Sequence, residues 1–202
     1  MPSKVESFLS RINACATAKT WVKANNVSAF EDGWKTCPEP DWLLRAVGNA
    51  GYEEGSARRV RNWVYQCLTQ VQSFIKDPRS IRAMQVLDAY VRGTGTPDDL
   101  SAALTSAQAA TDARVQADAL AQRASAEFHA TRAVASALSW SDDQWMTTAG
   151  VAPLFAARAV AQRPTTVDHD TLIQQRKQQA DLFRMIFAPE VGGLIANLEH
   201  LA

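Results

Sequence analysis

Apolar residues recur along this chain at the spacing of amphipathic α-helices. Near the start an apolar residue stands at every third or fourth position, namely at Val5, Phe8, Leu9 and Ile12. This spacing puts the four side chains on one face of a helix. Ser3 and Glu6 match the S-x-x-E capping box that opens a helix. The pattern predicts a first helix from about residue 4 to residue 24, ended by Asn25 and Asn26, which tolerate left-handed backbone.

The most regular apolar stripe lies farther along the first half of the chain. It consists of Val60, Trp63, Val64, Cys67, Leu68, Val71, Phe74 and Ile75. Unbroken helical spacing over several turns predicts the central helix of a core. Asp77 and Pro78 interrupt this helix, and another is expected from there to Gly93.

Residues 31–46, with the sequence EDGWKTCPEPDWLLRA, gather two tryptophans, a cysteine and two prolines. Pro38 ends a short helix, because the residue before a proline is disfavoured in helical backbone. Pro40 suits the first turn of the next helix, where a missing N–H costs nothing. The stretch is either a helix–loop–helix corner built for packing or a surface that holds something.

The best-marked helix start is Thr96-Pro97-Asp98-Asp99, which supplies a cap, a first-turn proline and two acids at the positive end of the helix dipole. Alanine dominates from there to about residue 138, and neither proline nor glycine occurs from Leu100 to Gln144. Alanine is the strongest helix former and lets neighbouring helices approach closely. One long helix or two are both allowed, and we favour two, joined near Thr111-Asp112.

The rest of the chain continues the helical pattern. Ser141 opens another capping box, and Pro153 and Asp168 stand near the starts of later helices. No stretch alternates apolar and polar residues convincingly, as a strand would. We therefore expect an all-α fold of about eight or nine helices, in an irregular bundle or a superhelical stack. Residues 1–202 are expected to form a single domain, with a subdivision near 94–112 left open.

Composition narrows the class of partner and the compartment. Lys and Arg number 21 and so do Asp and Glu, so no net field attracts nucleic acid or an anionic membrane. The sequence has no apolar run long enough to span a bilayer and no signal-peptide pattern at its start. Cys15, Cys37 and Cys67 leave an odd thiol and suit a reducing compartment. We expect a cytoplasmic protein that contacts neither nucleic acid nor membrane.

Candidate catalytic groups have structural explanations that compete with chemistry. The chain has three histidines, His129, His169 and His200. None has a partner at the spacing of a metal-binding helix, although His169-Asp170 looks like the pair in HD-type phosphohydrolases. Asp98-Asp99 and Asp142-Asp143 could suggest magnesium ligands, yet both pairs suit helix N-termini. We expect no catalytic residue, no metal site and no cofactor.

The tryptophans and one basic tract complete the candidates. Arg58, Arg59 and Arg61 are too few in a neutral protein to indicate nucleic acid binding, so a solvated helix face with ion pairs to neighbouring glutamates is expected. Trp34 and Trp145 lie in weakly patterned segments. There an indole ring either fills a gap between helices or is presented to a partner.

One ordered set of residues resembles a known family. It runs through Cys15, Trp21, Trp34, Cys37-Pro38, Asp41-Trp42-Leu43, the central helix and Ala89-Tyr90-Val91-Arg92-Gly93, and it closes with Gln175, Gln179, Ala180, Asp181, Leu182, Arg184 and Ile186. Together these residues resemble the helical immunity proteins proposed from bacterial polymorphic-toxin gene neighbourhoods, which have relatives in actinobacterial phages. The match covers most of residues 11–187, but Leu44-Arg45-Ala46 stands where the family carries a bulkier side chain. The arginines that open the central helix also replace a more apolar run.

The resemblance implies a cytoplasmic, non-enzymatic protein that binds and neutralises a protein partner, such as a toxin, without a cofactor. The expected partner-binding residues are Trp34, Glu39, Asp41 and Arg45, because an inhibitor needs rigid aromatic anchors and complementary charge. In the competing interpretation, Asp41 only charges a helix N-terminus and Trp34 packs beneath it. The alternative function is a helical accessory or scaffold protein of phage or bacterial origin, dimerising through its alanine-rich helices, and an enzyme is the third.

Overall fold

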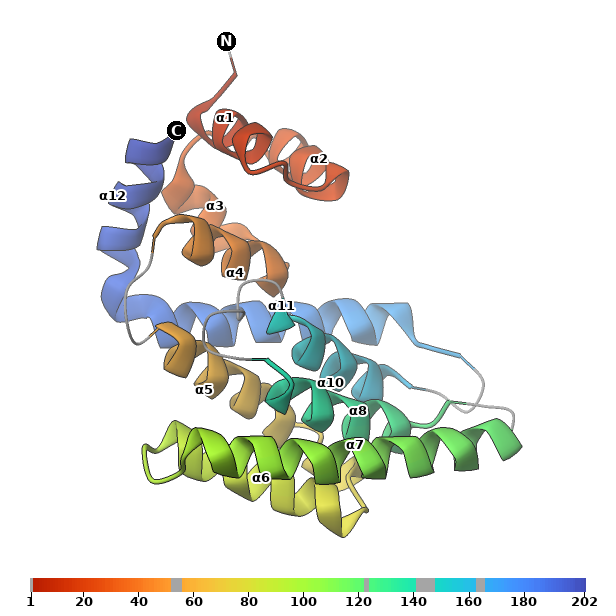
Figure 1. Cartoon of the computed structure of the whole chain (residues 1–202). Coiled ribbons are helices and arrows are strands. Elements are labelled where there is room, and N and C mark those ends of the chain that lie inside the picture. The colour runs from red at the N-terminus through yellow and green to blue at the C-terminus, as the bar shows by residue number, and fades with distance from the viewer. Residues whose placement is uncertain (1, 52–55, 122–123, 141–147, 163–165) are drawn as a thin grey trace. The chain divides into compact units, whose positions relative to one another are not determined.

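The computed structural model describes residues 2–51, 56–121, 124–140, 148–162 and 166–202. Every regular element in these ranges is a helix (Figure 1), and the one extended pairing within them is an isolated bridge between Gln162 and Val167. The expectation of an all-α fold is confirmed. The described residues form more helices than the eight or nine expected, because the first predicted helix is divided and a separate helix closes the chain.

Contacts divide the chain into two compact units, which are described separately below. Unit 1 consists of residues 1–54 and 180–202, and unit 2 consists of residues 55–179. A division by contacts does not test whether the two units fold as one domain, so the single domain expected from the sequence stays a prediction.

Unit 1 is built from short helices. They are α1 (Lys4–Arg11), α2 (Ala16–Ala24), α3 (Phe30–Thr36), α4 (Pro40–Asn49), the end of α11 (His169–Phe187), the 3-10 turn η2 (Ala188–Glu190) and α12 (Val191–Leu201). The predicted capping box of Ser3 and Glu6 is confirmed at the start of α1. Pro40 occupies the first turn of α4, also as predicted.

The continuous helix predicted over residues 4–24 is wrong, because the chain turns after α1. Asn13 has a φ of +50°, and Cys15 is the N-cap of α2. Asparagine tolerates left-handed backbone better than most residues, so it can reverse the chain where an apolar stripe continues. Asn26, with a φ of +53°, follows the end of α2 in the predicted way.

Unit 2 is organised around α5. It contains α5 (Ser56–Thr69), the 3-10 turn η1 (Gln72–Phe74), α6 (Pro78–Val91), α7 (Pro97–Leu120), α8 (Ala126–Leu138), α10 (Val151–Ala161) and residues 169–179 of α11. The side chains of α5 that have no exposed surface are Val60, Trp63, Val64, Cys67 and Leu68. The predicted central helix is therefore confirmed over these turns, although α5 ends at Thr69, before the end of its apolar stripe.

The alanine-rich region forms two helices, as predicted, but the break is not at Thr111-Asp112. Thr111 lies within α7, where its hydroxyl donates to a backbone carbonyl one turn earlier. The break between α7 and α8 is fixed by Asp118, which is 6% exposed. Its carboxylate accepts hydrogen bonds from the N–H and the hydroxyl of Ser125, the N-cap of α8, and pairs with Arg114. A buried acid therefore joins the end of one helix to the start of the next.

The solvated arginine face predicted for α5 is wrong at Arg61, which is 3% exposed. Its guanidinium donates to the backbone carbonyl of Trp140 at 2.7 Å and lies 3.9 Å from the centre of that indole ring. Trp140 follows the end of α8, so the cation is placed at the negative end of a helix dipole. The neighbouring glutamates that were expected to pair with these arginines are Glu53 and Glu54, and both lie outside the described residues.

Candidate functional site

An apolar pocket in unit 1 is the candidate site. Its volume is about 80 Å³, and helices α1 to α4 and α12 line it. The lining residues are Val5, Phe8, Leu9, Ala18, Trp21, Val22, Phe30, Gly33, Trp34, Cys37, Trp42, Leu43, Ala46 and Leu198. The lining consists of aliphatic and aromatic residues, one glycine and the thiol of Cys37, and it contains no charged residue.

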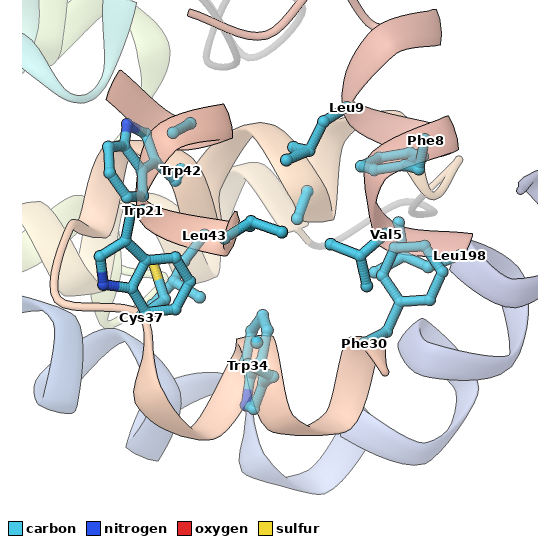
Figure 2. A pocket seen from close by; sticks show the side chains of 14 residues that line it. Val5, Phe8, Leu9, Trp21, Phe30, Trp34, Cys37, Trp42, Leu43 and Leu198 are labelled. Carbon is cyan, nitrogen blue, oxygen red and sulfur yellow. The ribbon is translucent and has the colours of Figure 1, made fainter. Parts of the chain in front are cut away.

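Five aromatic residues line the pocket. Figure 2 shows Trp21 and Trp42 on one side and Phe8 and Phe30 on the other, with Trp34 between them. The ring centres of Trp21 and Trp42 are 5.8 Å apart, and those of Phe8 and Phe30 are 5.4 Å apart in an edge-to-face arrangement. Pairs in this distance range stabilise beyond simple area burial. The wall is therefore held in place by contacts between its own members.

Trp34 is buried, with 7% of its surface exposed. One part of its ring lines the pocket, and its ring centre lies 6.1 Å from that of the fully buried Phe183. Gly33 precedes it, and a Cβ at that position would lie 3.3 Å from a methyl group of Val27. The small residue thus lets α3 pack closely where the tryptophan enters the core.

Arg184 fixes the backbone around Trp34. Its guanidinium donates to the carbonyl of Trp34 at 3.2 Å and to the carbonyl of Cys37 at 2.8 Å, at the C-terminal end of α3. The same guanidinium pairs with Asp181 at 2.7 Å. A cation at the C-terminus of a helix satisfies carbonyls that have no intrahelical partner. Arg184 therefore positions the pocket without lining it.

The two cysteines of unit 1 differ in character. Burial raises the pKa of the Cys37 thiol to about 11, and its sulfur donates to the carbonyl of Glu39 at 3.3 Å. Cys15 is exposed and lies outside the pocket. The hydrogen bond with Thr17 lowers the pKa of Cys15, and backbone N–H groups at the start of α2 add to this effect. Because its pKa is raised, the Cys37 thiol in the pocket is protonated at neutral pH.

The predicted partner-binding residues lie on α3 and α4. Of the four, only Trp34 lines the pocket. Glu39 is the N-cap of α4 and Asp41 stands in its first turn, and both are partly buried. Arg45 is exposed on the same helix. The competing interpretation of Asp41 as a charge near a helix N-terminus agrees with its place in α4.

Sequence reasoning missed the pocket, although it identified several of its side chains as helical core. Phe8 and Leu9 were expected in the first apolar stripe, and both lie on α1. Trp21 drew attention only through the family resemblance. The sequence does show five pocket-lining aromatic residues within its first 42 positions. Whether these side chains come together depends on how four short helices pack.

The other candidates for chemistry have structural roles or lie elsewhere. Asp99 forms a capping box with Thr96 at the start of α7, so the capping interpretation is confirmed there. His129 is 7% exposed, and burial and two nearby arginines lower its pKa. Within the described ranges, no group of three or more His, Cys, Asp or Glu side chains is arranged to hold a metal ion. Trp145 and Asp142-Asp143 lie outside those ranges.

Comparisons with known proteins found no family model, no curated protein and no solved structure that matches this chain. Among the helices of the described residues, none is both long enough and apolar enough to cross a membrane.

Proposed function

We propose that this chain is a non-enzymatic protein-binding protein, and that the unit 1 pocket receives one apolar side chain of its partner. The observation that carries the proposal is the pocket itself, which has apolar walls and a volume of about 80 Å³. Pockets for metabolites measure roughly 300–1,000 Å³ and add convergent polar groups. The smaller size and the aromatic lining favour a single inserted side chain.

The aromatic wall also supports tight binding. Protein interfaces derive most of their affinity from a few anchors that fill well-packed, desolvated pockets, and tryptophan is enriched among such residues. Trp21 and Trp42 are only partly buried and are held against each other at 5.8 Å. A rigid wall of this kind loses little conformational entropy when a partner binds.

Basic side chains lie on α1 and α2, whereas α3 and α4, which also line the pocket, carry Glu31, Asp32 and Asp41 in their first turns. The segment that forms α1 and α2 contains four basic residues, Lys4, Arg11, Lys19 and Lys23. Its one acidic residue is Glu6, which is engaged in the capping box. The α1 and α2 side of the pocket would therefore attract an acidic residue next to the anchoring side chain of the partner.

Neutralisation of a toxin by steric occlusion is the role that the resemblance to immunity proteins implies, and it is part of the proposal. The alternative function is a scaffold that dimerises through its alanine-rich helices. Ala103, Ala107 and Ala110 of α7 are buried within unit 2, so a second copy could pack only against exposed alanines of that helix, such as Ala109 and Ala113.

A pocket-filling variant tests the proposal. Ala46→Leu adds apolar bulk to the lining, whereas Ala24→Leu adds the same bulk to an exposed position of α2 outside the pocket. Each variant, checked for folding by circular dichroism, is used to capture partners from a native lysate, which are identified by mass spectrometry. We expect one abundant protein that is lost with Ala46→Leu and retained with Ala24→Leu. Retention by both variants would refute the pocket as the binding site.

The inhibitory role needs its own experiment. The captured protein is expressed in bacteria with and without the chain, and growth is measured. We expect the partner alone to arrest growth and co-expression of the chain to restore it, with no restoration by Ala46→Leu. A partner that is harmless alone would refute toxin neutralisation while leaving protein binding intact.

A further inference from the structure

A second hollow lies between α6 and α7 in unit 2, with a volume of about 490 Å³. Helix α6 contributes Arg79, Arg82 and Val86 to its lining, and α7 contributes Asp99, Ala102 and Ser106. The small side chains of α7 leave the space open. Its size falls within the range of pockets that hold small molecules, roughly 300–1,000 Å³.

The α6 side of the groove carries two arginines, Arg79 and Arg82, and Asp77 forms an ion pair with the first of them. Arg79 and Arg82 stand three residues apart, which places them on one face of the helix. Arg79 donates hydrogen bonds to the carboxylate of Asp77 from Nε at 3.0 Å and from Nη2 at 2.7 Å. The other terminal nitrogen of Arg79, Nη1, does not bond to Asp77. Within the described part of the chain, no residue forms a hydrogen bond or ion pair with Arg82. Its five N–H donors are therefore available to a ligand.

The acid on the opposite side does not neutralise these arginines. One oxygen of the Asp99 carboxylate accepts hydrogen bonds from the N–H and the hydroxyl of Thr96, at 2.9 and 2.7 Å. This capping box holds Asp99 at the start of α7. Its negative charge disfavours a second anionic group on the α7 side. An anion in the groove would therefore lie against α6.

We propose that this groove binds a small organic anion, whose oxyanion is held by Arg79 and Arg82 and whose apolar part lies on Val86 and Ala102. The planar guanidinium of Arg82 can bind carboxylate or phosphate oxygens with two parallel hydrogen bonds, and Arg79 can add the N–H groups of its remaining terminal nitrogen. The alanine and valine surface gives the rest of the ligand an apolar contact. The groove shares no residue with the unit 1 pocket, so this inference is independent of the proposed protein binding.

Phenyl phosphate is the probe, because it joins a phosphate to an apolar ring. The full-length chain is titrated with it by isothermal calorimetry, and parallel titrations use inorganic phosphate and benzyl alcohol. We expect saturable binding of phenyl phosphate that weakens as salt is added. Inorganic phosphate should bind more weakly, and benzyl alcohol should not bind measurably.

Two variants locate the binding. Arg82→Gln should weaken the affinity for phenyl phosphate about tenfold or more, because it removes charge-assisted hydrogen bonds. Arg132→Gln removes an exposed arginine from α8 of the same unit and should leave the affinity unchanged. Ala102→Phe fills the groove from an exposed helix position and should abolish binding. Equal weakening by the two arginine variants, binding that survives Ala102→Phe, or no saturable binding of phenyl phosphate would overturn the proposal.

Discussion

The guanidinium of Arg184 donates a hydrogen bond of 2.8 Å to the backbone carbonyl of Cys37, 147 residues earlier in the chain. Both residues belong to unit 1, and the bond attaches the end of α3 to α11. The side chain of Arg184 is 18% exposed. Because solvent has little access to this contact, the carbonyls it satisfies would lack an equivalent partner without it.

Replacement of Arg184 should destabilise unit 1. In Arg184→Met the aliphatic stem is kept, but the carbonyls of Trp34 and Cys37 lose their donor. Hydrogen bonds to charged groups contribute about 1.5–3 kcal/mol, so the free energy of unfolding should fall by about that amount. Urea unfolding monitored by tryptophan fluorescence measures it.

The ion pair of the same guanidinium supplies the control for that measurement. The carboxylate of Asp181 pairs with Arg184 but is 69% exposed, and exposed pairs contribute at most about 1 kcal/mol. Asp181→Asn should therefore cost less than Arg184→Met. If the two variants lose the same stability, the carbonyl contacts are not what makes Arg184 important.

Arg61 provides a second prediction, in unit 2. In Arg61→Leu the carbonyl of Trp140 loses its buried donor and the indole ring loses its cation, so we expect a loss of roughly 2–4 kcal/mol. Arg58→Leu changes an exposed arginine of the same helix and should shift stability by no more than about 0.5 kcal/mol. Thermal unfolding of both variants compares them. Similar melting temperatures would contradict the capping role of Arg61.

These two arginines show where sequence reasoning stops. The apolar stripe of α5 and the prolines around α4 are local signals, and the helices they predict are present. Arg61 and Arg184 bind main-chain carbonyls of distant segments. Every residue has such a carbonyl, so no residue type or spacing identifies the partner. Charge alone suggested solvent exposure, which is wrong for Arg61.

The pocket was hidden from the sequence for a related reason. A stripe identifies the face of a helix that is buried, but it does not reveal whether the buried faces fill the space between them. Trp21 and Trp42 meet because α1 and α2 are separated by a turn at Asn13, where a continuous helix was expected. The left-handed backbone of Asn13 thus helps to set where Trp21, the aromatic residue of α2, lies.

His129 should make stability depend on pH. Burial lowers its pKa in the folded chain, and the charges of Arg158 and Arg132 lower it further. The unfolded chain, with an ordinary pKa of about 6.5, then binds a proton that the folded chain does not. Above about pH 6.5 His129 is neutral in both states and does not lower the free energy of unfolding. As the pH falls from there towards the pKa of His129 in the folded chain, the free energy of unfolding decreases.

Urea unfolding of the wild type and of His129→Phe, at pH 7.5 and pH 5.5, measures this contribution. We expect the free energy of unfolding to fall more between these pH values in the wild type than in His129→Phe. His169→Gln changes an exposed histidine and should keep the wild-type difference. The prediction fails if His129→Phe retains the full pH dependence.

The three thiols should react in sequence, with Cys15 first. Cys15 is exposed, whereas Cys37 and Cys67 are buried, and burial raises the pKa of both buried thiols. A colorimetric disulfide reagent should therefore modify one thiol in the native chain and all three in denaturant, since the thiolate is the nucleophile.

The hydrogen bond with Thr17 lowers the pKa of Cys15, so Thr17→Val should move the pH dependence of its alkylation rate to higher pH. Thr20→Val, an exposed change on the same helix, should not, and an identical shift in both variants would show that the hydroxyl of Thr17 is not responsible.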